Sequence, residues 1–477
     1  MSKKLLTVFA VLVVVLVGVS LVAAQTLPGS GWKSGQQIQN VGTANAQVVF
    51  QAYNAAGTAF NCGSNTVAPG ASTNYLTDVH CPVPAGFIGS AVVSADQPIA
   101  AIVNVNNKGT GNAAGQYRGT DGADVNTSIA FPLVKNNFNG RTTTFYVQNA
   151  STSTNNISAT FRVGNQTFPK AFNNVPANAM VVVSPADASV PAGAVGSLTV
   201  TGTQPLAGTS LEHEAGVSVA NNLQGSKAFT PNDYDDTAYC PLVRHAQANS
   251  VQTTGIQAQN VGAAAQAIKV DYSYSIGGGA VQTKSVTSPS LAVGESFTFF
   301  SADATNGIPA GALGSAKVTG VGGGNIAVVV NDRSNNPALP TRFTTYSCFG
   351  ASSTTADVVL PLYKEFFGGN TTGIQIQNVG GAPATVEVTY SPDGGSPVTF
   401  THANAIAPGA SATFYGVSQL ISPPGISVVS GSAATLNNSF GGVVITSDQP
   451  IVAIANESSS APGASGQDTK NYEGFNQ

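Results

Sequence analysis

Charged side chains are scarce in this chain. Only 8% of its 477 residues are Asp, Glu, Lys or Arg, compared with roughly 25% in ordinary soluble domains. The formal net charge of -4 is small, so the chain lacks the strong basic character with which proteins bind nucleic acid. Solubility must therefore depend on uncharged polar residues, and nucleic acid is not an expected partner.

Catalytic residue types are equally sparse. A Ser-His-Asp or Cys-His nucleophile needs a histidine held by an acid, and the four histidines fall in different parts of the chain. His213 lies between Glu212 and Glu214, but in an extended segment neighbouring side chains point to opposite faces. Paired carboxylates for glycoside hydrolysis need two acids in one cleft, which so few acids make hard to build. The sequence indicates a protein that is not an enzyme. The histidines are His80, His213, His245 and His402.

Long apolar runs are absent except at the N-terminus. Lys3 and Lys4 precede an apolar run over 5–22, and the small residues Ala23 and Ala24 follow it. This is the pattern of a secretory signal peptide over residues 1–24, with cleavage before Gln25. An uncleaved membrane anchor is the alternative. We expect no membrane span after cleavage and a location outside the cell or at its surface.

Cysteine is limited to four residues, which allow three pairings. Cys62 and Cys81 flank a turn-rich segment, and Cys240 and Cys348 bracket another part of the chain. For an exported chain we expect the disulfides Cys62–Cys81 and Cys240–Cys348. Two pairs of buried free thiols are the alternative.

Glycine, proline and β-branched residues are abundant, with 53 Gly and 26 Pro, and favour short strands joined by turns. One short motif, Gln-Asn followed in three copies by Val-Gly, occurs four times. Its asparagines are spaced by 149 − 40 = 109, 260 − 149 = 111 and 378 − 260 = 118 residues. Such a period defines a repeated structural unit. The repeated asparagines are Asn40, Asn149, Asn260 and Asn378.

Each repeat contains about seven alternating segments, the size and turn spacing of an immunoglobulin-like sandwich. The expected fold is all-β: four tandem immunoglobulin-like β-sandwich domains after the signal peptide. Because the connectors are short, we expect the domains to form a semi-rigid rod. The expected domains are 25–128, 129–237, 238–356 and 357–477, the last with a polar C-terminal tail free to reach out.

The first repeat differs from the others. Pro361 lies 378 − 361 = 17 positions before Asn378, whereas Pro28 lies only 40 − 28 = 12 positions before Asn40. After cleavage before Gln25, little chain remains to form the strand that precedes the motif elsewhere. We therefore expect the first domain to lack an edge strand. Trp32, the single tryptophan, is either a core residue of this domain or an inter-subunit contact.

Acidic residues cluster at one connector, where Asp233, Asp235 and Asp236 are candidate calcium ligands. Calcium takes several oxygen ligands. The spacing matches no calcium-binding loop, so a solvated acidic turn is the alternative. No other cofactor is expected.

Gln39-Asn40-Val41-Gly42, followed by alternation and by Ala68-Pro69-Gly70-Ala71-Ser72, resembles repeats of bacterial cell-surface proteins with tandem immunoglobulin-like, cell-adhesion-related domains. The fourth repeat resembles them equally. The resemblance implies an extracellular location and assigns no ligand residues. We expect a structural or adhesive protein and, in a sharper form of this hypothesis, one that self-assembles into a filament or surface layer by strand complementation of domain 1. A rod-shaped adhesin that binds carbohydrate or protein is the alternative. Partners would be further copies, other surface proteins or glycans.

Overall fold

A computed structural model describes residues 11–13, 27–107, 111, 113–247, 251–334, 342–419, 425–459 and 469–477. The predicted signal peptide and its cleavage site lie outside these residues, apart from 11–13. The fold is all-β, with strands in several sheets and one short α-helix in the described part. None of the helices among the described residues is long and apolar enough to cross a membrane.

The strands fall into four equivalent units, each organised around one copy of the asparagine motif. Unit 1 contains β1 (Val11–Val13), β2 (Lys33–Asn40), β3 (Ala46–Asn54), β4 (Ala59–Val67), β5 (Ser72–Leu76), α1 (Thr77–His80), β6 (Gly89–Ala95), β7 (Ile99–Asn106) and β8 (Ala114–Arg118). Unit 2 contains β9 (Asn126–Asn136), β10 (Arg141–Asn149), β11 (Asn155–Val163), β12 (Gln166–Val175), β13 (Met180–Val183), β14 (Ala194–Glu214) and β15 (Leu223–Lys227), with 3-10 turns at Ala186–Ala188 and Pro231–Asp233.

Units 3 and 4 repeat this order. Unit 3 contains β16 (Thr237–His245), β17 (Gln252–Asn260), β18 (Ile268–Ile276), β19 (Gln282–Thr287), β20 (Ser296–Phe300), β21 (Ala312–Gly320), β22 (Ile326–Ser334), β23 (Phe343–Ser347) and β24 (Phe349–Gly350). Unit 4 contains β25 (Thr355–Glu365), β26 (Asn370–Asn378), β27 (Val386–Pro392), β28 (Val398–His402), β29 (Ser411–Phe414), β30 (Ile426–Ser430), β31 (Ser439–Ser459), β32 (Lys470–Glu473) and β33 (Phe475–Asn476). Their 3-10 turns are Ala351–Ser353, Val417–Gln419 and Ala433–Leu436.

Every unit is a sandwich of two antiparallel layers. We call one layer the motif sheet, because its second strand ends at the motif asparagine. In unit 1 it has the order β5-β2-β7-β8, and the outer sheet has the order β1-β6-β3-β4. In units 2 and 4 a single 21-residue strand, β14 or β31, serves both layers with its two halves. Buried apolar side chains such as Ile38, Phe50 and Val103 fill the space between the layers of unit 1.

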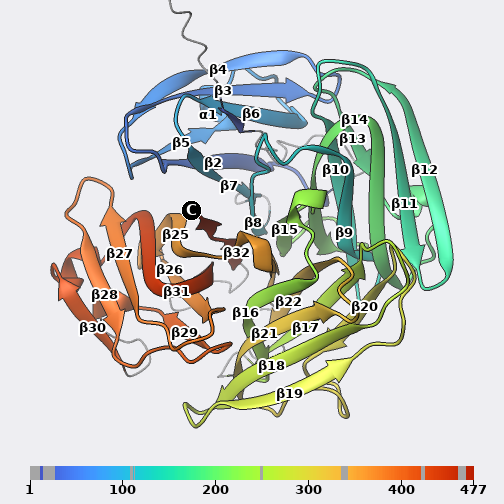
Figure 1. Ribbon diagram of the computed structural model, residues 1–477. Coiled ribbons are helices and arrows are strands. Elements are labelled where there is room, and N and C mark those ends of the chain that lie inside the picture. Colours follow the sequence, from blue (N-terminus) through green and yellow to red (C-terminus); the bar gives the residue numbers. More distant parts are fainter. Residues whose placement is uncertain are drawn as a thin grey trace, which may run out of the picture.

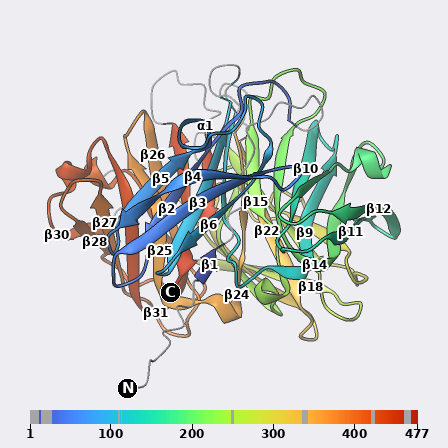
Figure 2. The ribbon, with the colours of Figure 1, turned by 90° about the horizontal axis from the view of Figure 1, so that it is seen from above.

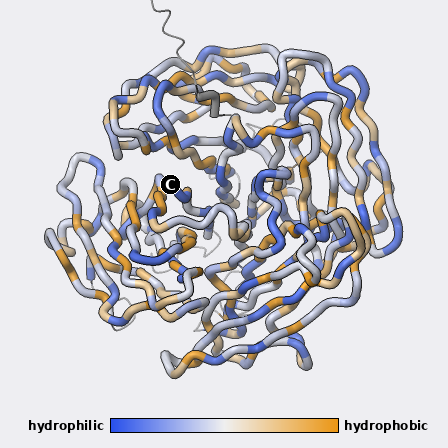
Figure 3. The backbone as a smooth tube through the Cα atoms, in the orientation of Figure 1, coloured by the Kyte–Doolittle hydropathy of each residue, from blue (hydrophilic) through white to orange (hydrophobic). Residues whose placement is uncertain are grey.

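The four units close into a ring. The last strands of the motif sheets meet around its centre, where β8 contacts β15, β15 contacts β23, β23 contacts β32, and β32 contacts β8. Figure 1 shows β8, β15 and β32 in the middle, with the outer sheets at the periphery. In Figure 2, turned by 90°, the strands lie side by side and their loops gather towards two ends. Apolar segments recur in all four units (Figure 3).

The rod predicted from the short connectors is therefore wrong. Ring closure depends on apolar residues that face away from the core of their own unit. Ala327 and Val329 of unit 3 pack against Ala130 and Phe229 of unit 2. Val452 and Ile454 of unit 4 belong to the core cluster of unit 3, and Ala100 and Ile102 of unit 1 belong to that of unit 4. Ring closure removes these surfaces from water. A rod would not cover both sides of every unit.

The strand order also departs from the immunoglobulin pattern. In an immunoglobulin sandwich the sixth and seventh strands, F and G, share one sheet. Here β6 pairs with β3 in the outer sheet, while the following β7 crosses to the motif sheet and pairs with β2. Units 2 and 4 make the same crossing within β14 and β31. Alternation in the sequence identified strands and buried faces, but it did not specify which strands pair.

Candidate functional site

The first strand of units 2, 3 and 4 occupies one edge of the outer sheet. β9 pairs with the first half of β14, β16 with β21, and β25 with the first half of β31. The pairing register shifts in all three around a proline: Pro132, Pro241 or Pro361. A proline has no N–H to donate, and a bulge accommodates it within a sheet. We call this place in each unit the first-strand position.

A tyrosine from the ring centre closes the bulge in two units. In unit 3, the Leu242 N–H donates to the Tyr346 hydroxyl at 3.1 Å, and that hydroxyl donates to the Leu242 carbonyl at 2.6 Å. In unit 4, Tyr472 makes the same two bonds with Leu362. Burial raises the pKa of both phenols, so they stay neutral and able to donate. Units 3 and 4 thus hold the bulge with the same pair of tyrosine hydrogen bonds.

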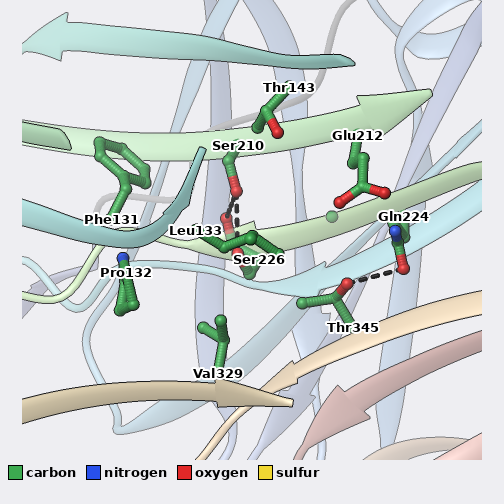
Figure 4. A pocket seen from close by; sticks show the side chains of 11 residues that line it. Phe131, Pro132, Leu133, Thr143, Ser210, Glu212, Gln224, Ser226, Val329 and Thr345 are labelled. Carbon is green, nitrogen blue, oxygen red and sulfur yellow. Dashed lines mark hydrogen bonds between the residues drawn. The ribbon is translucent and has the colours of Figure 1, made fainter. Parts of the chain in front are cut away.

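Unit 2 carries Ser226 where units 3 and 4 have these tyrosines, as the strand registers show. Its hydroxyl lies 2.9 Å from that of Ser210, and a cavity of about 10 Å³ remains beside Phe131, Pro132 and Leu133. Figure 4 shows the two serines joined by a hydrogen bond, with Thr345 of unit 3 donating to Gln224 nearby. Unit 2 therefore holds its first strand with smaller side chains.

Each first strand also brings a cation into the interior. The Lys135 Nζ lies 2.9 Å from the Glu212 carboxylate, and the Lys364 Nζ lies 2.9 Å from that of Glu457. In unit 3, Arg244 pairs with Asp332. The acid side chains are only 3–5% exposed. Buried ions of this kind need partners, so cation and acid depend on each other.

The surroundings set the charge state of these acids. Burial alone would raise the pKa of Glu457, but Lys470 at 2.5 Å and Lys364 outweigh burial, and the pKa is lowered. Lys135 and Arg141 lower the pKa of Glu212 in the same way. Burial dominates at Asp332, whose pKa is raised although Arg244 opposes the shift. Glu212 and Glu457 are therefore ionised partners of their cations.

Among its described residues, unit 1 has neither the cation nor the acid at this place. The strand registers pair Thr143 with Glu212, Thr254 with Asp332 and Thr372 with Glu457. The corresponding pair in unit 1 is Ser34 and Val105. Val105 is fully buried in the core of unit 1. The carboxylate is thus present in units 2, 3 and 4, which have their own proline-bulged first strand, and valine replaces it in unit 1.

In the full chain, the first-strand position of unit 1 holds β1. Val11 pairs with Ala95, Leu12 with Ser94, and Val13 with Val93 of β6. In unit 2, Ile129 pairs with Val200 at the position equivalent to Val13 and Val93. β1 belongs to the apolar run expected to be cleaved as the signal peptide. Removal of residues 1–24 would leave the backbone groups on this side of β6 without a neighbouring strand.

This position also affects the junction between units 1 and 2. In the other three junctions the first strand packs against the motif sheet of the next unit: β9 on β17 and β22, β16 on β26 and β31, and β25 on β2 and β7. Between units 1 and 2 a small apolar cluster forms instead, centred on Val92 and Ala207. The first-strand position of unit 1 therefore lies where two units meet.

The motif asparagines are fully buried turn-forming residues in all four units. The Asn260 Nδ2 donates to the carbonyls of Ala264 at 2.8 Å and Leu291 at 2.9 Å, while its Oδ1 accepts from the Gly262 N–H at 3.0 Å. Asn40 and Asn378 make equivalent bonds. Asn149 bonds Ser153, Val175 and Pro176, and its Oδ1 accepts from the Ser151 hydroxyl. The motif asparagines therefore organise the turn that follows each strand, and the fold covers them.

The connector aspartates are engaged by the protein itself. Asp233 pairs with Lys227 at 2.5 Å and accepts from the Thr230 N–H at 2.8 Å, and Asp235 accepts from the Ser352 N–H at 2.7 Å. In the part of the chain that the structure describes, no group of three or more His, Cys, Asp or Glu residues is placed to hold a metal ion. Asp236 lies near Gly323, apart from these contacts. The calcium site stays a prediction, and these contacts do not favour it.

The remaining predicted site residues lie in the interior. The structure contains both expected disulfides, Cys62–Cys81 and Cys240–Cys348. Trp32 is 3% exposed within the core of unit 1 and donates from Nε1 to the Pro28 carbonyl at 3.2 Å. It is a core residue, and a contact with another subunit does not fit its burial. His213 is likewise buried, with Nδ1 2.8 Å from the Glu214 carbonyl oxygen.

The C-terminal tail is not free to reach out, contrary to expectation. β32 pairs with β31 and lies at the centre of the ring, and β33 pairs with β25 through Phe475 and Asn476. Arg118 of unit 1 lies over the Phe475 ring at 4.1 Å and donates to the Gly474 carbonyl at 3.2 Å. The end of the chain therefore joins unit 4 to unit 1. Sequence reasoning missed this because the tail contains few apolar residues.

No family model and no curated protein matches this chain. The crystal structure of Thermotoga maritima 1070 is similar at 11% identity and a TM-score of 0.19, over 24% of this chain and 93% of that one. A tetra-tandem repeat in the extending region of a large adhesion protein is 12% identical, with a TM-score of 0.10, over 93% and 94%. A glycoside hydrolase family 32 structure from Bifidobacterium adolescentis is 9% identical, with a TM-score of 0.14, over 90% and 98%. At these TM-scores none of the three bears on function.

Proposed function

We propose that the mature protein is an exported, non-enzymatic structural or adhesive protein of the cell surface, and that its copies assemble through the first-strand position of unit 1. The observation that carries this proposal is the difference between unit 1 and the other units. Units 2, 3 and 4 supply a first strand from their own sequence. Unit 1 has only β1, from the segment expected to be cleaved. The two disulfides support an oxidising, extracellular location.

An open strand edge can accept a strand from another molecule, because main-chain hydrogen bonds supply affinity and side chains supply specificity. Val105 sets the specificity here. An incoming strand that carried Lys or Arg at this place would bury a charge without a carboxylate. Exchange of β9, β16 or β25 between copies is therefore disfavoured, since each carries such a cation. The donor strand must be uncharged.

We assign β30 of a second copy as the donor. It lies between β29 and β31, in a stretch longer than the equivalent stretches of units 1 to 3, and it pairs with β28 alone among the described strands. Its sequence, ISVVS, has no charged residue. Val428 and Val429 are 38% and 51% exposed. Joining β30 of one copy to β6 of the next uses two different surfaces, a contact that produces open chains unless the rotation closes a ring.

The test is the molar mass of the mature chain, residues 25–477, by light scattering across a concentration series. We expect oligomers or filaments that grow with concentration. The double variant Val428→Lys and Val429→Lys should remain monomeric, because lysine on an edge strand blocks pairing. Val321→Lys is the matched control, since Val321 is 48% exposed but lies outside the strands. A wild-type chain that stays monomeric rejects self-assembly, and a double variant that assembles normally rejects β30 as the donor.

A second candidate is a monomeric ring that binds carbohydrate or protein at its surface. It is supported by two hollows between units, of about 380 Å³ between units 2 and 3 and about 480 Å³ between units 4 and 1. Concave places of this kind are where ligands bind. A glycan array and a pull-down with the monomeric double variant test it, and the absence of any reproducible partner in both would count against it.

A further inference from the structure

The hollow between units 2 and 3 combines an apolar lining with an unusual number of cations. It lies where β9 of unit 2 meets β17, β20, β22 and β23 of unit 3. The apolar side chains that line it are Leu133, Phe138, Val195, Phe300 and Phe343. Phe300 is 48% exposed. A ring-shaped ligand would find several apolar surfaces against which to pack.

Three cations border the same space: Lys135, Arg141 and Arg333. The Arg141 guanidinium carbon lies 4.0 Å from the centroid of the Phe343 ring, and that of Arg333 lies 5.2 Å from it. Two guanidinium groups therefore share one aromatic ring. Burial, together with Arg141 and Arg333, lowers the pKa of Lys135, against the effect of Glu212. Like charges this close repel, and an anion bound between them would relieve the repulsion.

Only one carboxylate balances this group among the described residues that touch it. Glu212 pairs with Lys135 at 2.9 Å and with Arg141 at 3.1 Å, so the cluster keeps a charge of 3 − 1 = +2. The Arg141 Nη1 is buried without a hydrogen-bond partner in the described structure. Glu214, the strand neighbour of Arg141, is occupied by the Asn221 and Asn222 backbone N–H groups at 3.1 Å.

The hollow between units 4 and 1 is the natural comparison, because equivalent residues line it. Leu362, Lys364 and Phe367 stand where the first hollow has Leu133, Lys135 and Phe138. Its charges are closer to balance. Lys364 shares Glu457 with Lys470, and Lys33 pairs with Asp78 at 2.7 Å, so this group keeps a charge of 3 − 2 = +1. Asn106 occupies the position of Arg333, as the registers with Lys33 and Thr253 show. The shape is thus repeated with a smaller excess of positive charge.

We infer that the hollow between units 2 and 3 binds a carboxylate carried on a ring with an apolar face. The carboxylate would pair with Arg333, whose planar guanidinium suits it, and the ring would pack against Phe300 and Leu133. Two sources share this chemistry: a uronic acid residue of a polysaccharide and a free aromatic acid. This inference goes beyond self-assembly and does not depend on it.

Calorimetric titration of the mature chain with a glucuronate oligosaccharide and with benzoate tests the inference and distinguishes the two sources. We expect at least one of them to bind, with an affinity that falls as salt rises. Arg333→Gln should weaken binding at least tenfold. Arg333 is exposed, so the fold should tolerate the change. Lys33→Gln, in the hollow between units 4 and 1, should leave the affinity unchanged.

Three outcomes would overturn the inference: no binding of either acid at millimolar concentration, equal binding of methyl benzoate and benzoate, or unaltered binding by Arg333→Gln. Repeating the titration with the monomeric Val428→Lys and Val429→Lys variant separates it from the assembly proposal. An unchanged affinity there supports a site within one ring. Loss of binding in that variant would place the ligand at a contact between copies and contradict the inference.

Discussion

Units 1 and 4 share the same two sheets and the same asparagine turn, but they differ at the first-strand position. In unit 4 the strand β25 carries Lys364 to Glu457, and Tyr472 locks the bulge at Leu362. In unit 1 the acid is replaced by Val105. The comparison shows that a cation-bearing first strand and the carboxylate beneath it occur together in unit 4, whereas valine replaces the acid in unit 1.

A physical reason connects the two differences. A buried carboxylate without its cation would cost several kcal/mol in desolvation. A unit whose first strand brings no cation to this place therefore cannot keep the acid. Valine at this place leaves an apolar surface that an uncharged strand, whether β1 or one from another copy, can cover at little cost.

The largest expected effect comes from breaking the ion network of unit 4. Glu457→Gln leaves Lys364 and Lys470 buried without a carboxylate, and we expect the free energy of unfolding to fall by about 3–5 kcal/mol. Urea denaturation at pH 7 measures it. The control is Asp271→Asn, which removes the partly exposed pair with Lys269 and should cost at most about 1 kcal/mol. Equal losses in the two variants would show that the buried network contributes no more than a surface pair.

A second test makes unit 3 resemble unit 1 by loosening its first strand. Cys240 of β16 is bonded to Cys348 across 108 residues, whereas Cys62 and Cys81 are 19 residues apart. Because a disulfide that closes a longer loop restricts the unfolded chain more, replacing Cys240 and Cys348 by serine should cost about 2–4 kcal/mol, the larger of the two losses. Calorimetry of the two double variants compares them. A larger loss for the Cys62–Cys81 pair would contradict this ranking.

Replacing the motif asparagine should lower the free energy of unfolding by a similar amount in unit 3 and in unit 1. Asn260→Ala removes four hydrogen bonds and should lower the free energy of unfolding by about 1–3 kcal/mol. Asn40→Ala in unit 1 removes the equivalents of three of them, so its cost should agree within about 1 kcal/mol. Urea denaturation of both variants decides the matter. A much smaller loss at Asn40 would mean that the turn in unit 1 also depends on the first strand.

Lowering the pH should change the stability of units 2, 3 and 4, which contain the buried ion pairs, gradually and by a smaller amount. The pKa of Glu457 and of Glu212 is lowered in the folded protein. Their contribution to stability is therefore complete above the unfolded value of about 4.3 and is lost as pH falls through the lower folded value. Asp332 acts in the opposite sense, because its pKa is raised: its contribution is present below about 3.9 and lost as pH rises.

Unfolding free energies measured between pH 2 and 6 check these signs. Glu457→Gln should reduce the loss of stability on acidification, and Asp332→Asn should increase it. Both variants are compared with the wild-type slope at each pH. If the two variants changed the slope in the same direction, the pKa values of Glu457 and Asp332 would not be shifted in opposite directions.

Much of the architecture was readable from the sequence. The spacing of Asn40, Asn149, Asn260 and Asn378 predicted the repeat, and alternation predicted the buried faces of strands such as β18. Cysteine positions predicted both disulfides. The repeat and the alternation are patterns of the sequence itself, and four cysteines allow only three pairings, so no knowledge of strand pairing was needed.

The ring and the charge pairs were not predicted, because they depend on contacts between distant residues. One signal was available for the ring: 451–455 reads Ile-Val-Ala-Ile-Ala, apolar on both faces, which indicates a strand buried on both sides. Another was available for the pairs: Lys135, Arg244 and Lys364 each stand three residues after a proline in units 2 to 4. Unit 1 lacks this pattern together with the acid.

Hydrogen exchange of the β6 backbone amides in the mature chain shows whether the first-strand position of unit 1 is open. The observed amides are those over Gly89–Ala95 that face the first-strand position, compared with 194–201 of β14, which β9 covers. We expect the β6 amides to exchange much faster than those of β14 in dilute solution, and to slow as concentration rises and a strand from a second copy adds. Slow exchange of β6 that is independent of concentration would contradict an open first-strand position in unit 1.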